Sequence, residues 1–274
     1  MTTPGSVANL EGMNIIEQRL AKLDIKRLLS TDHPMVREFE FVPRSSTRST
    51  SKHADGWVYG DESFYFAIRI HLKPGVVYLQ QRDGSGVRIT PVKRVTTGLE
   101  EVGQGNRVLT IQDGGIVAEN STFFPNQEFN DLGIGSSFYV AQERLYRALG
   151  VRHVRLVAAA VGRYVWARQG FKFLHTEQAL TLGSGFRGFL RKCGIPSNGR
   201  FRHSWDLVNY HVPGAEREGD RIGKFFALQT FPVWEGFKRL DSAEHNDVAV
   251  ASRKETFSHL PDRIEGAADN LTSF

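Results

Sequence analysis

Apolar positions near the start of the chain follow the spacing of a helix. Between residues 12 and 29 they recur every three or four positions, as expected for a helix with one buried face. Pro34 disfavours helical geometry in the residue before it, so this helix should end by Asp32. The stretch 44–52 is polar and shows no periodicity. We interpret it as a loop or linker that closes an N-terminal helical segment, residues 1–54.

From Trp57 the pattern changes to short runs rich in β-branched and aromatic residues, separated by glycine. Such runs are typical of strands, and the glycine-containing turns at 84–86 and 113–115 are of the kind that closes a hairpin. The sequence therefore predicts a meander of antiparallel strands. The predicted strands are Phe64–Leu72, Val76–Gln80, Val87–Val95, Arg107–Ile111 and Ile116–Phe124.

Helices and strands alternate in the next part of the chain. An apolar stripe over 136–149 predicts a helix, and Gly150 stands where a glycine commonly follows a helix end. A strand over 151–160, a helix over 161–169 and a strand from Phe171 follow. This order predicts an α/β unit joined to the meander, and hence an α/β (α+β) fold.

The C-terminal part is aromatic and basic. Its pattern predicts a helix over 179–193 and a strand over 221–231, and the chain becomes polar after Leu240. We interpret residues 176–250 as an extension that packs on the preceding unit. Residues 251–274 are expected to be poorly ordered.

Composition and charge exclude several classes of protein. The single cysteine excludes a disulfide framework and any multi-cysteine zinc or iron–sulfur site within the chain. No stretch approaches the ~20 consecutive apolar residues of a membrane-spanning helix, and residues 1–14 lack the pattern of a signal peptide, so we expect a cytoplasmic protein. The net charge of +5 favours an anionic partner, although the charges are scattered rather than gathered in a nucleic-acid-binding tail.

The segment 128–137 lies between a predicted strand and a predicted helix. Gly133 and Gly135 let the backbone turn tightly and leave amide groups pointing outward at the helix N-terminus, and the two serines that follow add hydroxyl donors. Oriented donors and the helix dipole favour a phosphate there. Phe138 stands where a Rossmann fingerprint has its third glycine, and no lysine follows as in a Walker loop. The pattern by itself is equally compatible with a tight turn that binds nothing.

The motifs that follow this turn extend the pattern. The Gly-Ile-Gly turn is followed by an amphipathic helix, a Leu-Gly-Val, a strand, a short helix and a Gly-Phe pair. This order resembles the GNAT superfamily of acyl-CoA-dependent N-acyltransferases. The resemblance covers roughly residues 64–173 and implies a GNAT-like domain over 55–175, with a mixed, mostly antiparallel sheet flanked by helices. The segments that carry it are 132–136, 147–151, 154–158 and 166–171.

The resemblance also implies a donor and a way to hold it. The donor is acyl-CoA as a co-substrate, with no permanently bound cofactor. Its pyrophosphate is held by the turn and the helix N-terminus, its pantetheine arm lies beside the preceding strand, and its thioester lies in a splay between two strands. The residues implied in binding are Phe123, Phe124, Asn130, Leu132, Gly133, Ile134, Gly135, Ser136, Ser137 and Trp166.

Two positions depart from the family pattern. Asn130 stands where the family has a glutamine or arginine at the pyrophosphate. Trp166 stands where the family often has a tyrosine that protonates the departing thiolate, and an indole is a poor acid. The candidates for the acid that protonates the thiolate are then water, Tyr164 and a residue of the C-terminal part. Glu119, on the strand before the turn, is the predicted base, with Glu128 as the alternative.

The remaining candidates are histidines, the cysteine and a set of aromatic residues. His175 is a candidate for the acceptor site and His153 is interpreted as structural, whereas the spacing of His203 and His211 does not fit a metal pair, so no metal site is predicted. Cys193 lacks the surroundings of a nucleophile. The aromatic residues form either core or a tunnel for a long acyl chain; they are Phe186, Phe189, Trp205, Tyr210, Phe225, Phe226, Phe231 and Trp234.

Together these patterns predict an N-acyltransferase that moves an acetyl or longer fatty-acyl group from a CoA thioester to a primary amine of a small molecule or a peptide side chain. An acyl carrier protein in place of free CoA is the main variant. The alternative is a non-catalytic module that binds CoA or a peptide, and nucleic acid is not expected as a partner. The extension is expected to shape the acceptor site, the acyl pocket or the interface of a homodimer.

Overall fold

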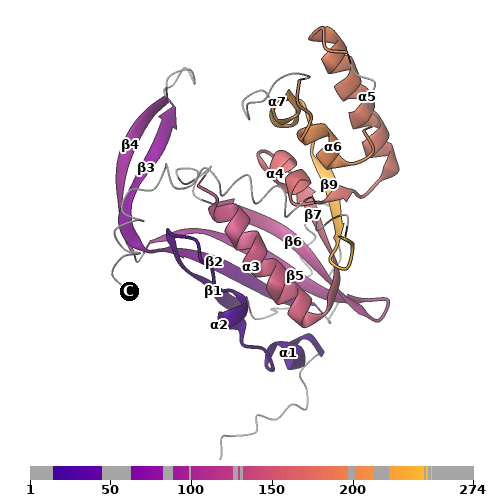
Figure 1. Cartoon of the computed structure of the whole chain (residues 1–274). Coiled ribbons are helices and arrows are strands. Elements are labelled where there is room, and N and C mark those ends of the chain that lie inside the picture. Colours follow the sequence, from indigo (N-terminus) through magenta and orange to yellow (C-terminus); the bar gives the residue numbers. More distant parts are fainter. Residues whose placement is uncertain are drawn as a thin grey trace, which may run out of the picture.

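A mixed sheet of seven strands forms the centre of the protein in the computed structural model (Figure 1). The structure describes residues 15–44, 63–82, 89–98, 100–125, 129, 132–196, 201–212, 222–243, 245 and 248. The strands of this sheet are β1 (Val36–Arg44), β2 (Phe64–Leu72), β5 (Glu101–Gln112), β6 (Gly115–Pro125), β7 (Val151–Ala158), β8 (Lys172–Phe173) and β9 (Trp234–Arg239). Their order is β1-β2-β5-β6-β7-β9-β8, and only β6 and β7 are parallel neighbours.

Helices flank this sheet, which confirms the predicted fold class. They are α1 (Ile15–Leu20), α2 (Ile25–Leu28), α3 (Ile134–Leu149), α4 (Gly162–Arg168), α5 (Thr176–Lys192), α6 (Ser204–Val208) and α7 (Ile222–Gln229). Helix α3 connects β6 to β7 and crosses the sheet, α1 and α2 pack against α3, and α4 to α7 gather around β7, β8 and β9 (Figure 1). Across the described residues we find no helix with the length and apolar character needed to cross a membrane.

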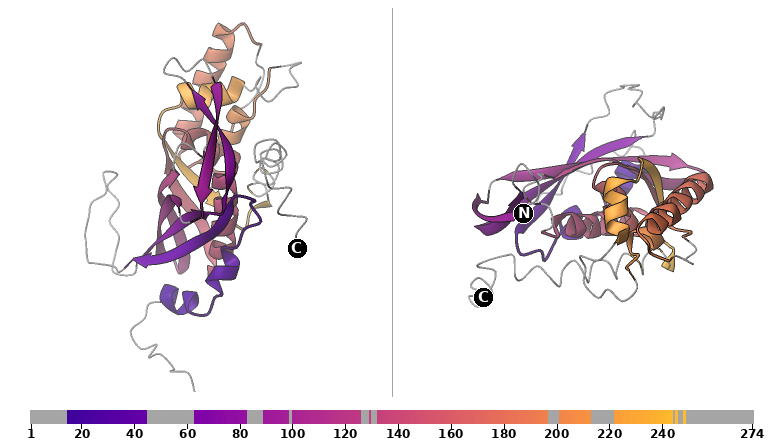
Figure 2. Two further views of the ribbon diagram at one scale, coloured as in Figure 1. Left: turned by 90° about the vertical axis from the view of Figure 1, so that its left-hand side faces the viewer. Right: turned by 90° about the horizontal axis from the view of Figure 1, so that it is seen from above.

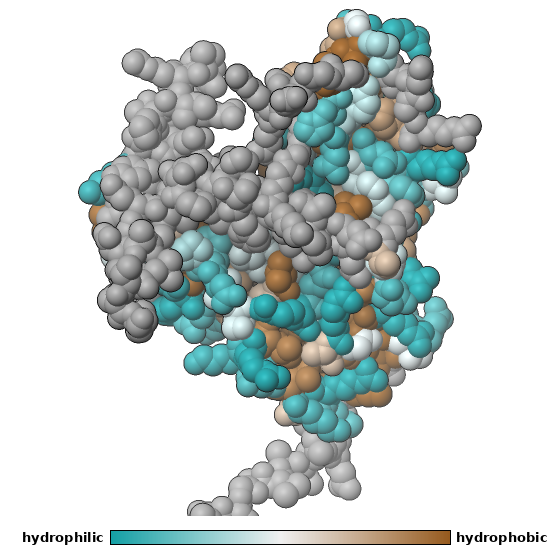
Figure 3. All heavy atoms as spheres, viewed as in Figure 1, coloured by the Kyte–Doolittle hydropathy of each residue, from teal (hydrophilic) through white to brown (hydrophobic). Residues whose placement is uncertain are grey.

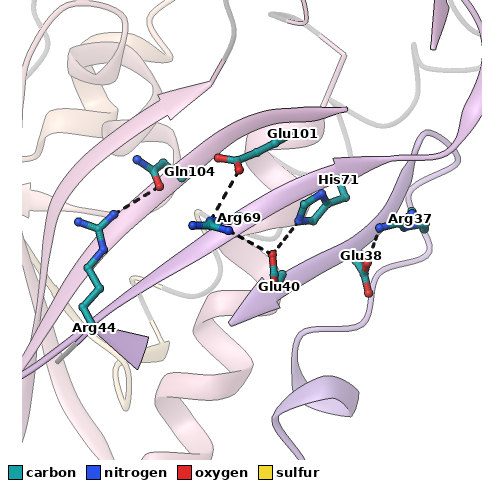
Figure 4. A network of polar contacts seen from close by, with 8 residues as sticks. All are labelled: Arg37, Glu38, Glu40, Arg44, Arg69, His71, Glu101 and Gln104. Atoms are coloured by element: carbon teal, nitrogen blue, oxygen red, sulfur yellow. Dashed lines mark hydrogen bonds and ion pairs between the residues drawn. The ribbon is translucent and has the colours of Figure 1, made fainter. Parts of the chain in front are cut away.

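The two faces of the sheet differ in polarity. On the face covered by α3, Phe66 and Ile68 of β2 are buried in the core. On the opposite face, Arg69 lies between Glu40 and Glu101, at N–O distances of 3.9 and 3.6 Å (Figure 4). Antiparallel strands commonly have one face on the core and one in water. The view in Figure 3, from the side of Figure 1, shows hydrophilic side chains interspersed with small apolar patches.

The hairpin of β3 (Pro74–Arg82) and β4 (Ile89–Thr97) does not belong to the main sheet. Both strands are at predicted positions, but they pair only with each other, from Pro74 opposite Thr97 to Arg82 opposite Ile89. They form a twisted ribbon beside the body of the protein (Figures 1 and 2). The expectation of one continuous meander was therefore wrong, because β2 pairs directly with β5 and the ribbon is left out.

Three other expectations need correction. The predicted helix over 12–29 is two short helices, since Asp24 caps α2 by accepting a hydrogen bond from the amide of Arg27. The predicted strand over 221–231 is helix α7. Strands β1 and β9 were not predicted, and they join the sheet from regions assigned to the N-terminal segment and the C-terminal extension. The domain division at residues 54 and 175 stays a prediction, although one sheet crosses both positions.

Candidate functional site

Strands β6 and β7 separate half-way along the sheet. They pair in parallel from Ile116 opposite Val151 to Asn120 opposite Leu156. Beyond Asn120, β6 continues on β5 alone, while the end of β7 pairs with β9, with Val157 opposite Glu235. We call the opening between β6 after Asn120 and β7 after Leu156 the fork. The backbone edge of β6 that faces the fork is thus not covered by β7.

A β-bulge lies at the base of the fork. Asn106 of β5 is opposite Thr122, but the next residue, Arg107, is opposite Asn120, so Ser121 is the extra residue on β6. The hydroxyl of Ser121 is buried and makes no hydrogen bond within the described part of the chain. Bulges re-aim backbone and side-chain groups beside functional sites.

A buried polar network holds the two residues on either side of Ser121. The guanidinium of Arg107 donates to the carbonyl of Thr122 (2.5 Å) and to Gln142 of α3 (2.5 Å). Gln142 in turn donates to Oδ1 of the Asn120 side chain (3.0 Å). Full burial lowers the pKa of Arg107 to about 10, so the group remains charged at neutral pH. The network therefore fixes the bulge to α3.

The turn before α3 has the geometry of an anion-binding nest. Gly133 is the N-cap residue, with φ 74° and ψ −1°, a left-handed conformation that favours glycine, and it provides no side-chain cap. The amides of the first turn are directed out of the helix end. Gly135 packs against Phe123 of β6, where an added Cβ would lie 3.5 Å from the ring, and Phe123 in turn packs on Phe138 at 4.7 Å between ring centroids. The nest therefore lies beside the free part of β6.

His33 supports the nest from below. Its Nδ1 accepts a hydrogen bond from the amide of Met35 (3.2 Å), so Nε2 carries the proton and donates to the carbonyl of Leu132 (2.8 Å). Burial lowers the pKa of His33, so the ring stays neutral. Sequence reasoning missed this residue, because nothing local links it to a partner 99 positions away.

Glu119 lies at the fork, on the face of the sheet opposite α3, which we call the open face. It is opposite Arg155 of β7 and contributes to the raised pKa of Tyr65, which results first from burial of the phenol and then from the carboxylate. The structure thus places the predicted base beside the strands that part. A groove runs along this place; its lining residues are Glu119, Arg155, Leu156, Val157, Leu174, Glu235 and Gly236.

The two residues singled out on α4 face different neighbours. Trp166 packs edge-on against Tyr139 of α3, with 5.5 Å between ring centroids. Tyr164 is buried on the other side of α4, where its hydroxyl accepts a hydrogen bond from Arg168 (3.0 Å) and Lys224 of α7 lies over its ring. Tyr164 therefore does not line the groove of Glu119.

The structure describes some of the other candidates and not others. Asn130 and Glu128 lie outside the described residues, as does the side chain of Phe124. In the first turn of α3, Ser136 is partly exposed and Ser137 is buried. His175 lies 3.4 Å from Glu235, at the groove. Buried members of the aromatic set favour the interpretation as core; they include Phe186, Phe226, Phe231 and Trp234.

Comparisons of the sequence with known proteins found no match. No family model matches it, and no curated protein matches its sequence. Similar solved structures include nourseothricin acetyltransferase, 14% identical, which covers 50% of this chain and 84% of its own with a TM-score of 0.26. Another is described as "putative acyl-CoA N-acyltransferase", from Klebsiella pneumoniae subsp. pneumoniae, 11% identical over 74% of this chain and 97% of its own, with a TM-score of 0.27.

Proposed function

We propose that the protein transfers an acyl group from a CoA thioester to a primary amine. The observation that carries the proposal is the fork, which has the nest of Gly133 at the start of the helix joining its two strands. A fork of this kind offers a slot through the sheet, and the nest offers donors for a pyrophosphate at the mouth of that slot. The resemblance to the GNAT superfamily implies the same placement, with the pyrophosphate at the turn and the thioester between the two strands.

The donor is held by backbone more than by side chains. The pyrophosphate lies on the amides of the nest, with hydroxyls of Ser136 and Ser137 and with Asn130 as further predicted donors. The pantetheine arm lies in the fork and pairs with the free edge of β6 beside Phe123 and Phe124, as an added strand does. The thioester then reaches Ser121 at the bulge.

The acceptor approaches from the open face, where Glu119 lies. Glu119 takes a proton from the ammonium group, and the neutral amine nitrogen attacks the thioester carbonyl carbon. The C–N bond forms, the C–S bond breaks, and the second proton that the nitrogen loses as it becomes an amide passes through water to the departing thiolate. The indole of Trp166 is too poor an acid to serve, and the hydroxyl of Tyr164, which was a candidate acid, is on the other side of α4, where it accepts from Arg168.

Release of free thiol from acyl-CoA in the presence of a pool of primary amines tests this function. Acetyl-CoA and longer acyl-CoAs, and an acyl carrier protein, serve as donors in parallel, with Gly135→Asp as the variant that places a carboxylate in the nest. Amine-dependent release by the wild type and none by the variant supports the proposal. Absence of amine-dependent release with every donor contradicts it.

The second candidate function is CoA binding without transfer. The tryptophan at the position of an acid favours it. Binding of acyl-CoA that is abolished by Gly135→Asp, with no thiol release, is the result this alternative expects.

A further inference from the structure

A second hollow adjoins the groove of Glu119 on the open face of the sheet. Its volume is about 310 Å³. It shares Arg155 and Leu174 with the groove, so the two lie side by side along β7 and β9. The residues that line it are Arg152, His153, Arg155, Leu174, Phe237, Arg239 and Asp241.

The hollow carries an excess of positive charge. Three arginines line it, against one carboxylate, that of Asp241, which is already paired with Arg239 at 2.8 Å. Burial lowers the pKa of His153, and then the charges of Arg155, Arg239 and Arg152 lower it further. The three arginines thus make the electrostatic potential at the ring of His153 positive, which favours the neutral form of the ring.

A polar group that lines the hollow also lacks a hydrogen-bond partner in the described part of the chain. Nε2 of His153 is buried and makes no hydrogen bond to any described residue. A buried ring nitrogen between arginines is suited to an oxyanion, because a carboxylate or phosphate can accept from guanidinium groups and from a ring N–H together. The hollow therefore has the charge of an anion site, and the buried ring nitrogen beside it has no described partner.

We propose that this hollow binds the oxyanion, a carboxylate or a phosphate, of an acceptor whose amino group lies at Glu119. The inference rests on the proposed function, because it assigns the groove to the amine. Glu235 adds a second carboxylate to the groove, so the amine end is acidic and the hollow is basic. Glu119 is opposite Arg155 of β7, which is two residues from His153, or roughly 7 Å along the strand. The acceptor is thus a zwitterion with its charges on the order of 10 Å apart.

Matched amines test the proposal. The acceptors are 8-aminooctanoate, 8-aminooctyl phosphate, 8-amino-1-octanol and octylamine, with acyl-CoA as donor. We expect kcat/KM to be at least tenfold higher for one of the two anionic amines than for the neutral pair, and the better anion identifies carboxylate or phosphate. Combined Arg152→Gln and Arg239→Gln substitutions should reduce this ratio to about one, whereas Arg152→Lys with Arg239→Lys should restore part of it. The control, Arg69→Gln in the surface network of Figure 4, should leave the ratio unchanged.

Binding without chemistry separates this inference from the proposed function. In an NMR titration, 8-aminooctanoate or 8-aminooctyl phosphate should raise the pKa of His153, because a bound anion favours the protonated ring, and octylamine should not. A raised pKa without transfer to any amine keeps the anion site and overturns the proposed function. Transfer with equal kcat/KM for anionic and neutral amines, and an unmoved His153, overturns the anion site and leaves the function intact.

Discussion

The imidazole of His33 donates a hydrogen bond of 2.8 Å to the carbonyl of Leu132, the residue directly before the left-handed Gly133. The histidine comes from the turn between α2 and β1, whereas Leu132 belongs to the segment between β6 and α3. This contact ties the nest to a distant part of the chain. It also requires a neutral ring, because the other ring nitrogen accepts from Met35.

Stability should therefore fall at acid pH in a way that depends on His33. Its folded-state pKa lies below the ordinary value of 6.5, so the unfolded chain takes up the proton at higher pH. The contribution is complete above pH 6.5 and is lost as pH falls below it, towards the folded-state pKa. We expect His33→Gln to be less stable by about 1 kcal/mol at pH 7.5 and to lose less stability on acidification.

Denaturant unfolding of both proteins between pH 7.5 and 5 measures this difference. The pKa of His153 is also lowered by burial, but that residue is present in both proteins and cancels in the comparison. Parallel pH profiles for the two proteins would show that His33 does not carry the effect.

Two substitutions at Gly135 should distinguish the effect of an added side chain from the effect of an added negative charge. An added Cβ meets Phe123 at 3.5 Å, an ordinary van der Waals contact, so Gly135→Ala should fold with unchanged or slightly higher stability and keep CoA binding. Gly135→Asp places a carboxylate against the pyrophosphate and should abolish binding. Calorimetric titration with CoA tests both, and Gly188→Asp on α5, where an added Cβ meets nothing, is the matched control. Equal affinity of Gly135→Asp and wild type would remove the nest from the binding site.

Replacement of Glu119 should act on turnover and not on donor binding. Glu119→Gln keeps the shape of the side chain but cannot accept the amine proton, so kcat should fall by roughly 10²–10⁴. The Kd for acyl-CoA should stay the same. Glu101→Gln, on the same open face but in the surface network, is the control and should retain full kcat. Undiminished kcat in Glu119→Gln would exclude this residue as the base.

The network beneath α3 should matter for stability and for the fork. Arg107→Met leaves acceptors on Thr122 and Gln142 without their donor and should lower the free energy of unfolding by at least about 2 kcal/mol. Tyr146→Phe removes the hydrogen bond to Asn120 at 2.8 Å but leaves the guanidinium in place, and should cost about 1 kcal/mol. Equilibrium unfolding in urea measures both. An Arg107→Met protein as stable as the wild type would contradict the role given to the network.

The local sequence pattern predicted the elements around the fork because the spacing of their apolar residues matches the spacing of their buried positions. Helix α3 buries one stripe, and Gly150 ends it with φ 78°, as expected. Strand β9 was missed because Lys238 occupies a core position, where it pairs with Glu143 of α3 at 3.2 Å, and this breaks the apolar alternation. Helix α7 was taken for a strand because its aromatic run hides the spacing of Gly223, Phe226 and Ala227 on its buried side.

The geometry of the candidate site was predictable only where its parts are close in sequence. The nest and Glu119 follow from the segment that contains them. The parting of β6 and β7, the bulge at Ser121 and the support from His33 depend on pairing between distant segments, which no local pattern encodes. The basic hollow likewise needs β7 and β9 as neighbours, with His153 opposite Arg239.

Thermal unfolding with CoA, acetyl-CoA and longer acyl-CoAs tests most directly whether the fork is a CoA site. A ligand that binds only the folded state stabilises it by about 2.7 kcal/mol at 100 times its Kd, or roughly 5 to 10 °C in Tm for a chain of this size. We predict such a shift for the wild type and none for Gly135→Asp, with a larger shift for longer chains if the donor is fatty acyl-CoA. No shift with any of these ligands, or an equal shift in the variant, would contradict the account.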